Sequence, residues 1–167
     1  GQKLSAYLRT HLLEPLRMHD TAFRLTPAMR ARLAKIHQRD ADGTLRPTDT
    51  EIPQDPEFEM GGGGLYGTAA DYLKFLAMVL NEGHGPDGPV LSPRVIGWMR
   101  ANAIGELLVQ PLRAVLTQRS NDAEFFPGLP KRWSLAFQVN ETAAPTGRAA
   151  GTLMWAGLAN CYYWIDP

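Results

Sequence analysis

The sequence predicts an α+β fold, in which helices come first and a run of antiparallel strands follows. Two observations support this prediction. Residues 3–13, 27–35, 69–81 and 93–102 show helical spacing or helix-start signals, and residues 132–140, 152–157 and 159–165 have the composition of strands. With 167 residues, 44% of them hydrophobic, the chain is long enough to bury a core. We therefore expect one domain, with residues 1–131 mainly helix and loop and residues 132–167 forming the sheet.

The helices are predicted from their end signals and their apolar spacing. Thr68 is suited to cap the helix over residues 69–81, and Asp71 three residues later completes a capping box by reaching back. Gly83 is a natural stop for this helix. Thr26-Pro27 and Ser92-Pro93 are cap-plus-proline starts of two further helices. The apolar stripe of the helix over 69–81 consists of Ala69, Tyr72, Leu73, Leu76, Val79 and Leu80.

The strands are predicted from alternation and from turn residues. Residues 132–140 alternate with period two and predict one continuous strand, in which Ser134 would lie. Residues 152–157 and 159–165 predict two strands joined tightly near Gly157-Leu158. Asp42-Gly43 is a hairpin-type turn signal within a long polar segment, so we expect two short strands around it.

Composition excludes several classes of function. Seventeen basic and seventeen acidic residues give a formal net charge of zero, which argues against nucleic-acid partners. No apolar run approaches the ~20 residues of a membrane span. The single cysteine, Cys161, excludes an intrachain disulfide framework, favours a reducing compartment such as the cytoplasm, and is expected to be buried in its aromatic strand. The chain has no initiator Met and ends directly after a strand pattern, so we expect it to be part of a longer protein.

Common catalytic and cofactor motifs are absent. There is no phosphate-binding Walker loop, no His-Glu-x-x-His and no G-x-S-x-G, and the histidines show no ligand spacing, so we expect neither a cofactor nor a metal. Residues 62–67 match G-x-G-x-x-G, but the segment before them is acidic and broken by prolines instead of being a buried strand. Nucleotide binding is thus a hypothesis that rests on the glycines alone. The simpler interpretation is a turn whose backbone passes close to another group.

Five segments in order resemble serine β-lactamase-like hydrolases. This family includes class C β-lactamases, D-alanyl-D-alanine peptidases and the family VIII carboxylesterases. Residues 14–23 (EPLRMHDTAF) resemble its E-P-L-G-M-x-D-T-x-F stretch, and residues 62–72 (GGGLYGTAADY) resemble G-G-G-L-x-S-T-A-x-D-x. Residues 91–93 (LSP), 133–137 (WSLAF) and 154–167 (MWAGLANCYYWIDP) resemble its helix start, its G-L-G-F strand and its W-G-G-x-x-G-x-x-x-W-x-D-P ending.

The resemblance implies a fold and a division of the active site. The fold is a helical subdomain packed against an antiparallel sheet that is flanked by helices, with the site between them. The family's nucleophile belongs to S-x-x-K and its tyrosine base to Y-x-N, and neither motif occurs here. This chain is then the C-terminal half of one β-lactamase-like domain and is incomplete. We expect it to need the N-terminal half of the same protein and to be inactive alone.

The resemblance also assigns site residues. Trp155-Ala156-Gly157 stands where other members carry K-T-G, H-S-G or W-G-G on the strand that lines the site. The Leu158 N–H would then be an oxyanion donor, and Gly157 would allow close approach of the substrate. Trp155 and Ala156 would line the substrate groove, and Gly63 and Gly64 its rim. The alternatives are a core tryptophan and a plain glycine loop.

A tryptophan in place of the lysine favours a particular substrate class. A neutral indole cannot bind the substrate carboxylate that the lysine of K-T-G helps to bind, although Arg148, close in sequence, could restore a cation. We therefore expect a small-molecule ester or amide substrate and a carboxylesterase acting on neutral esters through an acyl-enzyme. The alternatives are a β-lactamase or D-Ala-D-Ala peptidase of the same fold, or a non-catalytic binding module that retains it.

Overall fold

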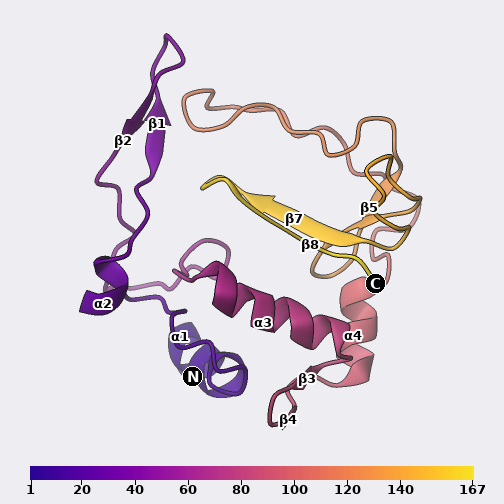
Figure 1. Cartoon of the computed structure of the whole chain (residues 1–167), viewed down its shortest axis with the longest axis horizontal. Coiled ribbons are helices and arrows are strands. Elements are labelled where there is room, and N and C mark those ends of the chain that lie inside the picture. Colours follow the sequence, from indigo (N-terminus) through magenta and orange to yellow (C-terminus); the bar gives the residue numbers. More distant parts are fainter. The chain divides into compact units, whose positions relative to one another are not determined.

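The computed structural model describes residues 1–167, and these form two compact units. The first unit consists of Gly1–Lys35 and Asp49–Pro93, and the second of Ile36–Thr48 and Arg94–Pro167. The first unit is built mainly on helices, and the second holds a four-stranded antiparallel sheet (Figure 1). The prediction of an α+β fold is therefore confirmed.

The first helix of the chain changes its geometry halfway. The α-helix α1 (Leu4–Leu8) continues directly into η1 (Arg9–Leu13), a π-helical turn. The Glu14 N–H donates to the Arg9 carbonyl, 2.9 Å away, and the Met18 N–H donates to the Leu13 carbonyl, 2.8 Å away. Pro15 has no N–H to continue the α-helical ladder, so neighbouring amides bond one residue farther back. The helix predicted over residues 3–13 is confirmed, with this wider second half.

The second helix is shorter than its sequence pattern predicts. In α2 (Pro27–Arg30) the Thr26 side chain accepts a hydrogen bond from the Met29 N–H, so the predicted cap is confirmed. The extension to residue 35 is wrong. Met29 is the one buried residue of α2, and residues 31–35 are all exposed. A short helix depends on tertiary packing for its stability, and this segment has no packed apolar side chain that would extend the helix.

The longest helix, α3 (Ala69–Leu80), has the predicted start and end. The Thr68 side chain accepts from the Asp71 N–H at 3.2 Å. At the other end, the Gly83 N–H donates to the Met78 carbonyl at 2.9 Å, with Glu82 and Gly83 both at positive φ, which is a Schellman motif. The Asp71 carboxylate does not reach back to Thr68 as predicted but bonds residues 20 and 21.

Two of the six residues in the predicted apolar stripe of α3 are buried. Leu76 and Val79 are buried, together with Met78, whereas Leu73 and Leu80 are exposed. Together with Leu13, Leu16, Met18, Phe23 and Met29, the buried residues of α3 form the core of the first unit. After α3 the chain forms a small hairpin from β3 (His84–Gly85) and β4 (Gly88–Pro89).

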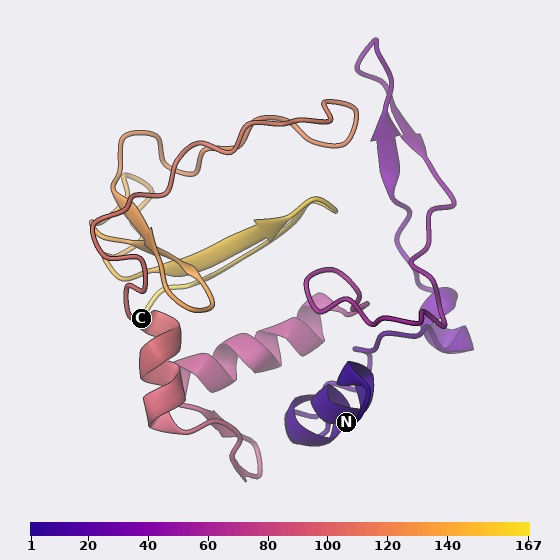
Figure 2. The same cartoon turned by 180° about the vertical axis from the view of Figure 1, so that it is seen from behind.

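The sheet of the second unit is a simple antiparallel meander (Figures 1 and 2). Its strands are β5 (Lys131–Trp133), β6 (Gln138–Asn140), β7 (Leu153–Gly157) and β8 (Cys161–Ile165), in the order β5-β6-β7-β8. The two predicted C-terminal strands are confirmed. Phe137, Leu153, Met154 and Ile165 are the buried apolar residues of this sheet and of the turn before β6.

The continuous strand predicted over residues 132–140 is wrong, because a turn divides it into β5 and β6. Ser134 is buried in this turn, and its Oγ accepts from the N–H groups of Ala136 at 3.1 Å and Phe137 at 2.8 Å. A serine hydroxyl that bonds backbone two and three residues later stabilises a turn in place of a ladder. Apolar residues on both sides of a tight turn imitate the alternation of one strand.

The remaining elements of the second unit agree with the sequence pattern. β1 (His37–Arg39) pairs with β2 (Leu45–Pro47) around Asp42-Gly43, with Gly43 at φ +87°. The helix α4 (Pro93–Arg100) ends two residues before its predicted end.

The exposure of Cys161 differs from its prediction. Cys161 is exposed, so the prediction of a buried cysteine is wrong; this residue is the first of β8, beside the turn. No helix is long and apolar enough to span a membrane.

Candidate active site at the end of β7

The strand β7 has an unpaired edge at its C-terminal end. β6 pairs with Leu153 and Met154 and extends no further along β7. Trp155, Ala156 and Gly157 therefore pair only with β8, through Tyr163, Tyr162 and Cys161 respectively. An unpaired strand edge presents backbone N–H and C=O groups that a ligand can bind in extended form. The segment assigned to the site from the sequence thus lies on the part of β7 that a ligand can reach.

The turn after β7 presents a free backbone donor. The Asn160 N–H donates to the Gly157 carbonyl at 3.0 Å, and Asn160 is at φ +60°. This is a type I turn followed by a left-handed residue, a common connection of antiparallel strands. The Leu158 N–H, at the second position of this turn, donates to no group of the chain, and the Leu158 side chain is 80% exposed. The predicted oxyanion donor is therefore available.

Gly157 has no structural need to be glycine. Its φ is not in the left-handed region, and a Cβ built on it would meet no atom within 4 Å. Neither backbone strain nor packing within this chain thus excludes a side chain at this position. The open space beside Gly157 is what close approach of a substrate to the strand requires.

Trp155 lies among other aromatic rings instead of in a closed core. It is half-buried, and its ring meets that of Trp133 with centroids 4.5 Å apart and that of Phe125 with centroids 6.2 Å apart. Sequence patterns did not indicate these two neighbours. Trp133 belongs to β5, and Phe125 lies in a loop that has no periodic pattern, so no local signal links either residue to Trp155.

Arg148 contacts the aromatic rings of Trp164 and Phe126. Its guanidinium lies 4.1 Å from the centre of the Trp164 ring, and its Nη1 is 3.8 Å from Met154 Sδ. Met154 and Trp164 are directly opposed in the ladder, so both project from one face of the sheet. The same guanidinium lines one cavity with Phe125 and Tyr162. That Arg148 replaces the lysine stays a prediction.

Gly63 and Gly64 lie in the first unit and differ in their surroundings. A Cβ on Gly64 would come within 2.6 Å of the Met60 carbonyl oxygen and 2.8 Å of Phe23 Cε1. A Cβ on Gly63 would meet only Met60 Sδ, at 3.8 Å. Gly64 is thus required for packing of its loop against Phe23. That these glycines form the rim of the site stays a prediction.

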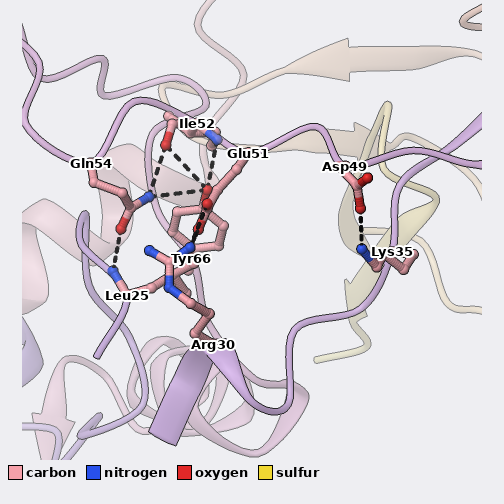
Figure 3. Close-up of polar contacts among 8 residues, drawn as sticks. All are labelled: Leu25, Arg30, Lys35, Asp49, Glu51, Ile52, Gln54 and Tyr66. Carbon is pink, nitrogen blue, oxygen red and sulfur yellow. Dashed lines mark hydrogen bonds and ion pairs between the residues drawn. The ribbon is translucent and has the colours of Figure 1, made fainter. Parts of the chain in front are cut away.

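The loop of residues 61–64, called here the glycine loop, is anchored by the nearby Tyr66, whose contacts Figure 3 shows. The Tyr66 hydroxyl accepts from the Ile52 N–H at 2.7 Å and from Gln54 Nε2 at 3.4 Å, and Gln54 Oε1 in turn accepts from the Leu25 N–H at 2.7 Å. The backbone of Tyr66 also exchanges two hydrogen bonds with Ala22. The same segments carry the ion pairs Arg30–Glu51 and Lys35–Asp49. Tyr66 therefore anchors the glycine loop through its hydroxyl, to Ile52 and Gln54, and through its backbone, to Ala22.

Substituting the two glycines separately tests this difference. Gly64→Ala is expected to lower the free energy of unfolding by about 1–3 kcal/mol, since the new methyl group must displace Phe23 or the backbone at Met60. Gly63→Ala is the matched control and is expected to change it by less than about 0.5 kcal/mol. Denaturant unfolding of both variants measures the difference. Equal effects of the two substitutions would contradict the packing argument.

Comparison with known proteins identifies the family of this chain. The family model described as Beta-lactamase matches residues 1–167. A curated protein, Protein Rv1367c from Mycobacterium tuberculosis, is 35% identical over 95 residues, which cover 56% of this chain and 24% of that protein.

Solved structures show the same fold. A mutant of simvastatin synthase (LovD) from Aspergillus terreus has a TM-score of 0.77 and 24% identity, covering 100% of this chain and 43% of its own. An octameric penicillin-binding protein homologue from Pyrococcus abyssi has a TM-score of 0.61 and 19% identity, covering 98% of this chain and 31% of its own. The chain thus spans about a quarter of its curated relative and less than half of these structures. A family match over its whole length shows that the chain belongs to the Beta-lactamase family.

Proposed function

We propose that the protein to which this chain belongs is a serine hydrolase that acts through an acyl-enzyme, and that it is a carboxylesterase for neutral esters. The observation that supports this most directly is the free Leu158 N–H beside the open space at Gly157, on an unpaired strand edge. The family and its structural neighbours are serine hydrolases or acyltransferases. Acyl transfer needs a backbone donor of this kind where negative charge develops.

In the proposed mechanism a serine oxygen attacks the ester carbonyl, and its proton passes to a base. The carbonyl oxygen becomes an oxyanion and accepts from the Leu158 N–H and from the N–H of the serine itself. The carbon–oxygen bond to the alcohol then breaks, the alcohol leaves with a proton, and an acyl-enzyme remains. Water attacks this intermediate in the same way, releasing the acid and restoring the serine. The serine and its base come from sequence outside this chain, so the 167-residue chain by itself carries no esterase activity.

The environment of Trp155 supports esters over anionic substrates. The ring neighbours of Trp155 are Trp133 and Phe125, and no guanidinium is stacked on any of these three rings. A substrate carboxylate placed beside Trp155 would therefore lose its water without gaining a cation, which is unfavourable. A neutral ester incurs no such cost. Trp155 thus offers a flat apolar wall for a substrate without charge.

The relative turnover of two substrates by the whole protein tests the esterase proposal. We expect kcat/KM for 4-nitrophenyl butyrate to exceed that for a chromogenic cephalosporin by at least about tenfold, since a charge-assisted contact to the cephalosporin carboxylate, worth about 1.5–3 kcal/mol, is missing. Trp155→Lys is expected to lower the ratio of kcat/KM for 4-nitrophenyl butyrate to kcat/KM for the cephalosporin. More efficient turnover of the cephalosporin by the wild-type protein would show that the preference for esters is wrong.

A further inference from the structure

The aromatic rings around Trp155 come from segments far apart in the sequence. The Phe125 ring meets Trp155 edge-to-face at an interplanar angle of 65°, and Trp133 meets the same ring at 67°. Phe125 also lies 6.5 Å from Tyr162, which is the β8 partner of Ala156 in the ladder. Edge-to-face contacts are the favoured geometry of aromatic pairs, so the three rings Phe125, Trp133 and Trp155, called here the aromatic wall, support one another.

The aromatic wall is accessible, unlike an ordinary aromatic core. Its three rings are each half-buried, and the adjoining Tyr162 is 60% exposed. Phe137, in the turn before β6, is in contrast only 2% exposed. Partly exposed rings held by one another keep apolar area available for a further ring at little cost in conformational freedom.

The aromatic wall carries no cation on its rings. The arginine contacts with aromatic rings in this unit fall on Phe126 and Trp164, through Arg148, and on Trp98, through Arg94. Phe125 and Phe126 are neighbours in sequence, yet only Phe125 belongs to the aromatic wall. The rings themselves therefore offer a ligand shape and apolar area, while Arg148 lines the adjoining cavity with Phe125 and Tyr162.

The distance from the free donor fits a substituent of limited length. Trp155 precedes Leu158 by three residues, which corresponds to about 10 Å along an extended strand. An ester whose carbonyl oxygen accepts from the Leu158 N–H would thus place a benzyl-sized group, but not a methyl group, against the aromatic wall. A larger apolar contact in the transition state raises kcat/KM.

We propose that Phe125 and Trp133, with Trp155, are specificity-determining residues that select esters carrying an aromatic group on the alcohol or the acyl side. This inference rests on the proposed esterase function and names its substrate class. The residues that determine it lie outside the Trp155-Ala156-Gly157 segment, on β5 and in the loop before it.

The test uses the whole protein and three esters: benzyl acetate, ethyl phenylacetate and ethyl acetate as the reference. Acid release at constant pH gives kcat/KM for each. The wild-type protein is expected to prefer at least one aromatic ester over ethyl acetate by about tenfold or more. Phe125→Ala is expected to lower kcat/KM for the preferred aromatic ester more than kcat/KM for ethyl acetate, which removes most of this preference. Phe125→Leu keeps apolar volume but removes the ring. Its preference for the aromatic ester over ethyl acetate is expected to lie between that of the wild-type protein and that of Phe125→Ala.

Phe126→Ala is the matched control, because its ring contacts Arg148 and not Trp155. It is expected to keep the wild-type preference. A preference that survives both Phe125 substitutions, or a wild-type protein that hydrolyses 4-nitrophenyl butyrate without preferring either aromatic ester, overturns the inference alone. A wild-type protein that hydrolyses none of these esters overturns the proposed function, and the inference with it.

Discussion

Leu158→Pro is expected to lower kcat/KM for ester hydrolysis by the whole protein about 10²–10³-fold, which is the usual effect of removing one oxyanion donor. Proline has no N–H, so the substitution deletes the donor that the structure leaves free. Proline is also favoured at the second position of a type I turn, so the turn after β7 is expected to form as before. Thermal unfolding of the variant should therefore match that of the wild-type protein.

A second variant separates the donor from the side chain. Leu158→Ala keeps the N–H and removes only a side chain that is 80% exposed, so its kcat/KM is expected to stay within a few fold of the wild-type value. The comparison of Leu158→Pro with Leu158→Ala thus isolates the backbone donor. If Leu158→Pro kept more than about a tenth of the wild-type kcat/KM, the oxyanion would be stabilised by other groups.

Asp71→Asn is expected to lower the free energy of unfolding by about 2–4 kcal/mol. Asp71 is buried, with 4% of its surface exposed, and its carboxylate accepts from the Asp20 N–H at 2.7 Å, the Thr21 hydroxyl at 3.1 Å and Lys74 Nζ at 2.6 Å. Lys74 donates in addition to the Arg17 carbonyl. An amide presents an NH₂ group to these donors and leaves some of them unsatisfied. Denaturant unfolding measures the loss.

The stability contributed by Asp71 is expected to depend on pH. Burial raises the pKa of this carboxyl, but the hydrogen bonds from Lys74, the Asp20 N–H and Thr21 together outweigh burial and hold the pKa below its usual value. A lowered pKa in the folded state stabilises the protein above the unfolded pKa of about 3.9, and this contribution is lost as the pH falls through the folded value. The difference between wild type and Asp71→Asn should therefore shrink as the pH is lowered from 7 toward 3.

Asp49→Asn provides the surface control for this experiment. Asp49 pairs with Lys35, and this contact lowers the pKa of its carboxyl, but the side chain of Asp49 is 95% exposed. Its loss is expected to change the free energy of unfolding much less than Asp71→Asn does, because water screens the pair. If the two substitutions had equal effects, or if the effect of Asp71→Asn did not change with pH, burial of a charged Asp71 would not be the reason for its contribution.

Much of the local structure of this chain could be predicted from neighbouring residues. The Thr68 cap, the end of α3 at Gly83 and the hairpin around Asp42-Gly43 each depend on a few adjacent side chains and on backbone preferences. The candidate site was instead assigned from the resemblance of residues 154–167 to a family ending, and its role stays a prediction. Where the prediction failed, as at Ser134, a hydrogen bond to the local backbone replaced the ladder that the alternation implied.

The sequence by itself determined the order of the helices and strands, because capping, turn formation and alternation act over a few residues. The segment that carries the candidate oxyanion donor was indicated by its resemblance to a family motif. Only the tertiary structure decided which distant groups meet. It directs the Asp71 carboxylate to residues 20 and 21, brings Phe125 and Trp133 to Trp155, and places Arg148 on Trp164. These contacts join residues from separate elements, and their partners depend on burial and on the register of the sheet, which no local pattern encodes.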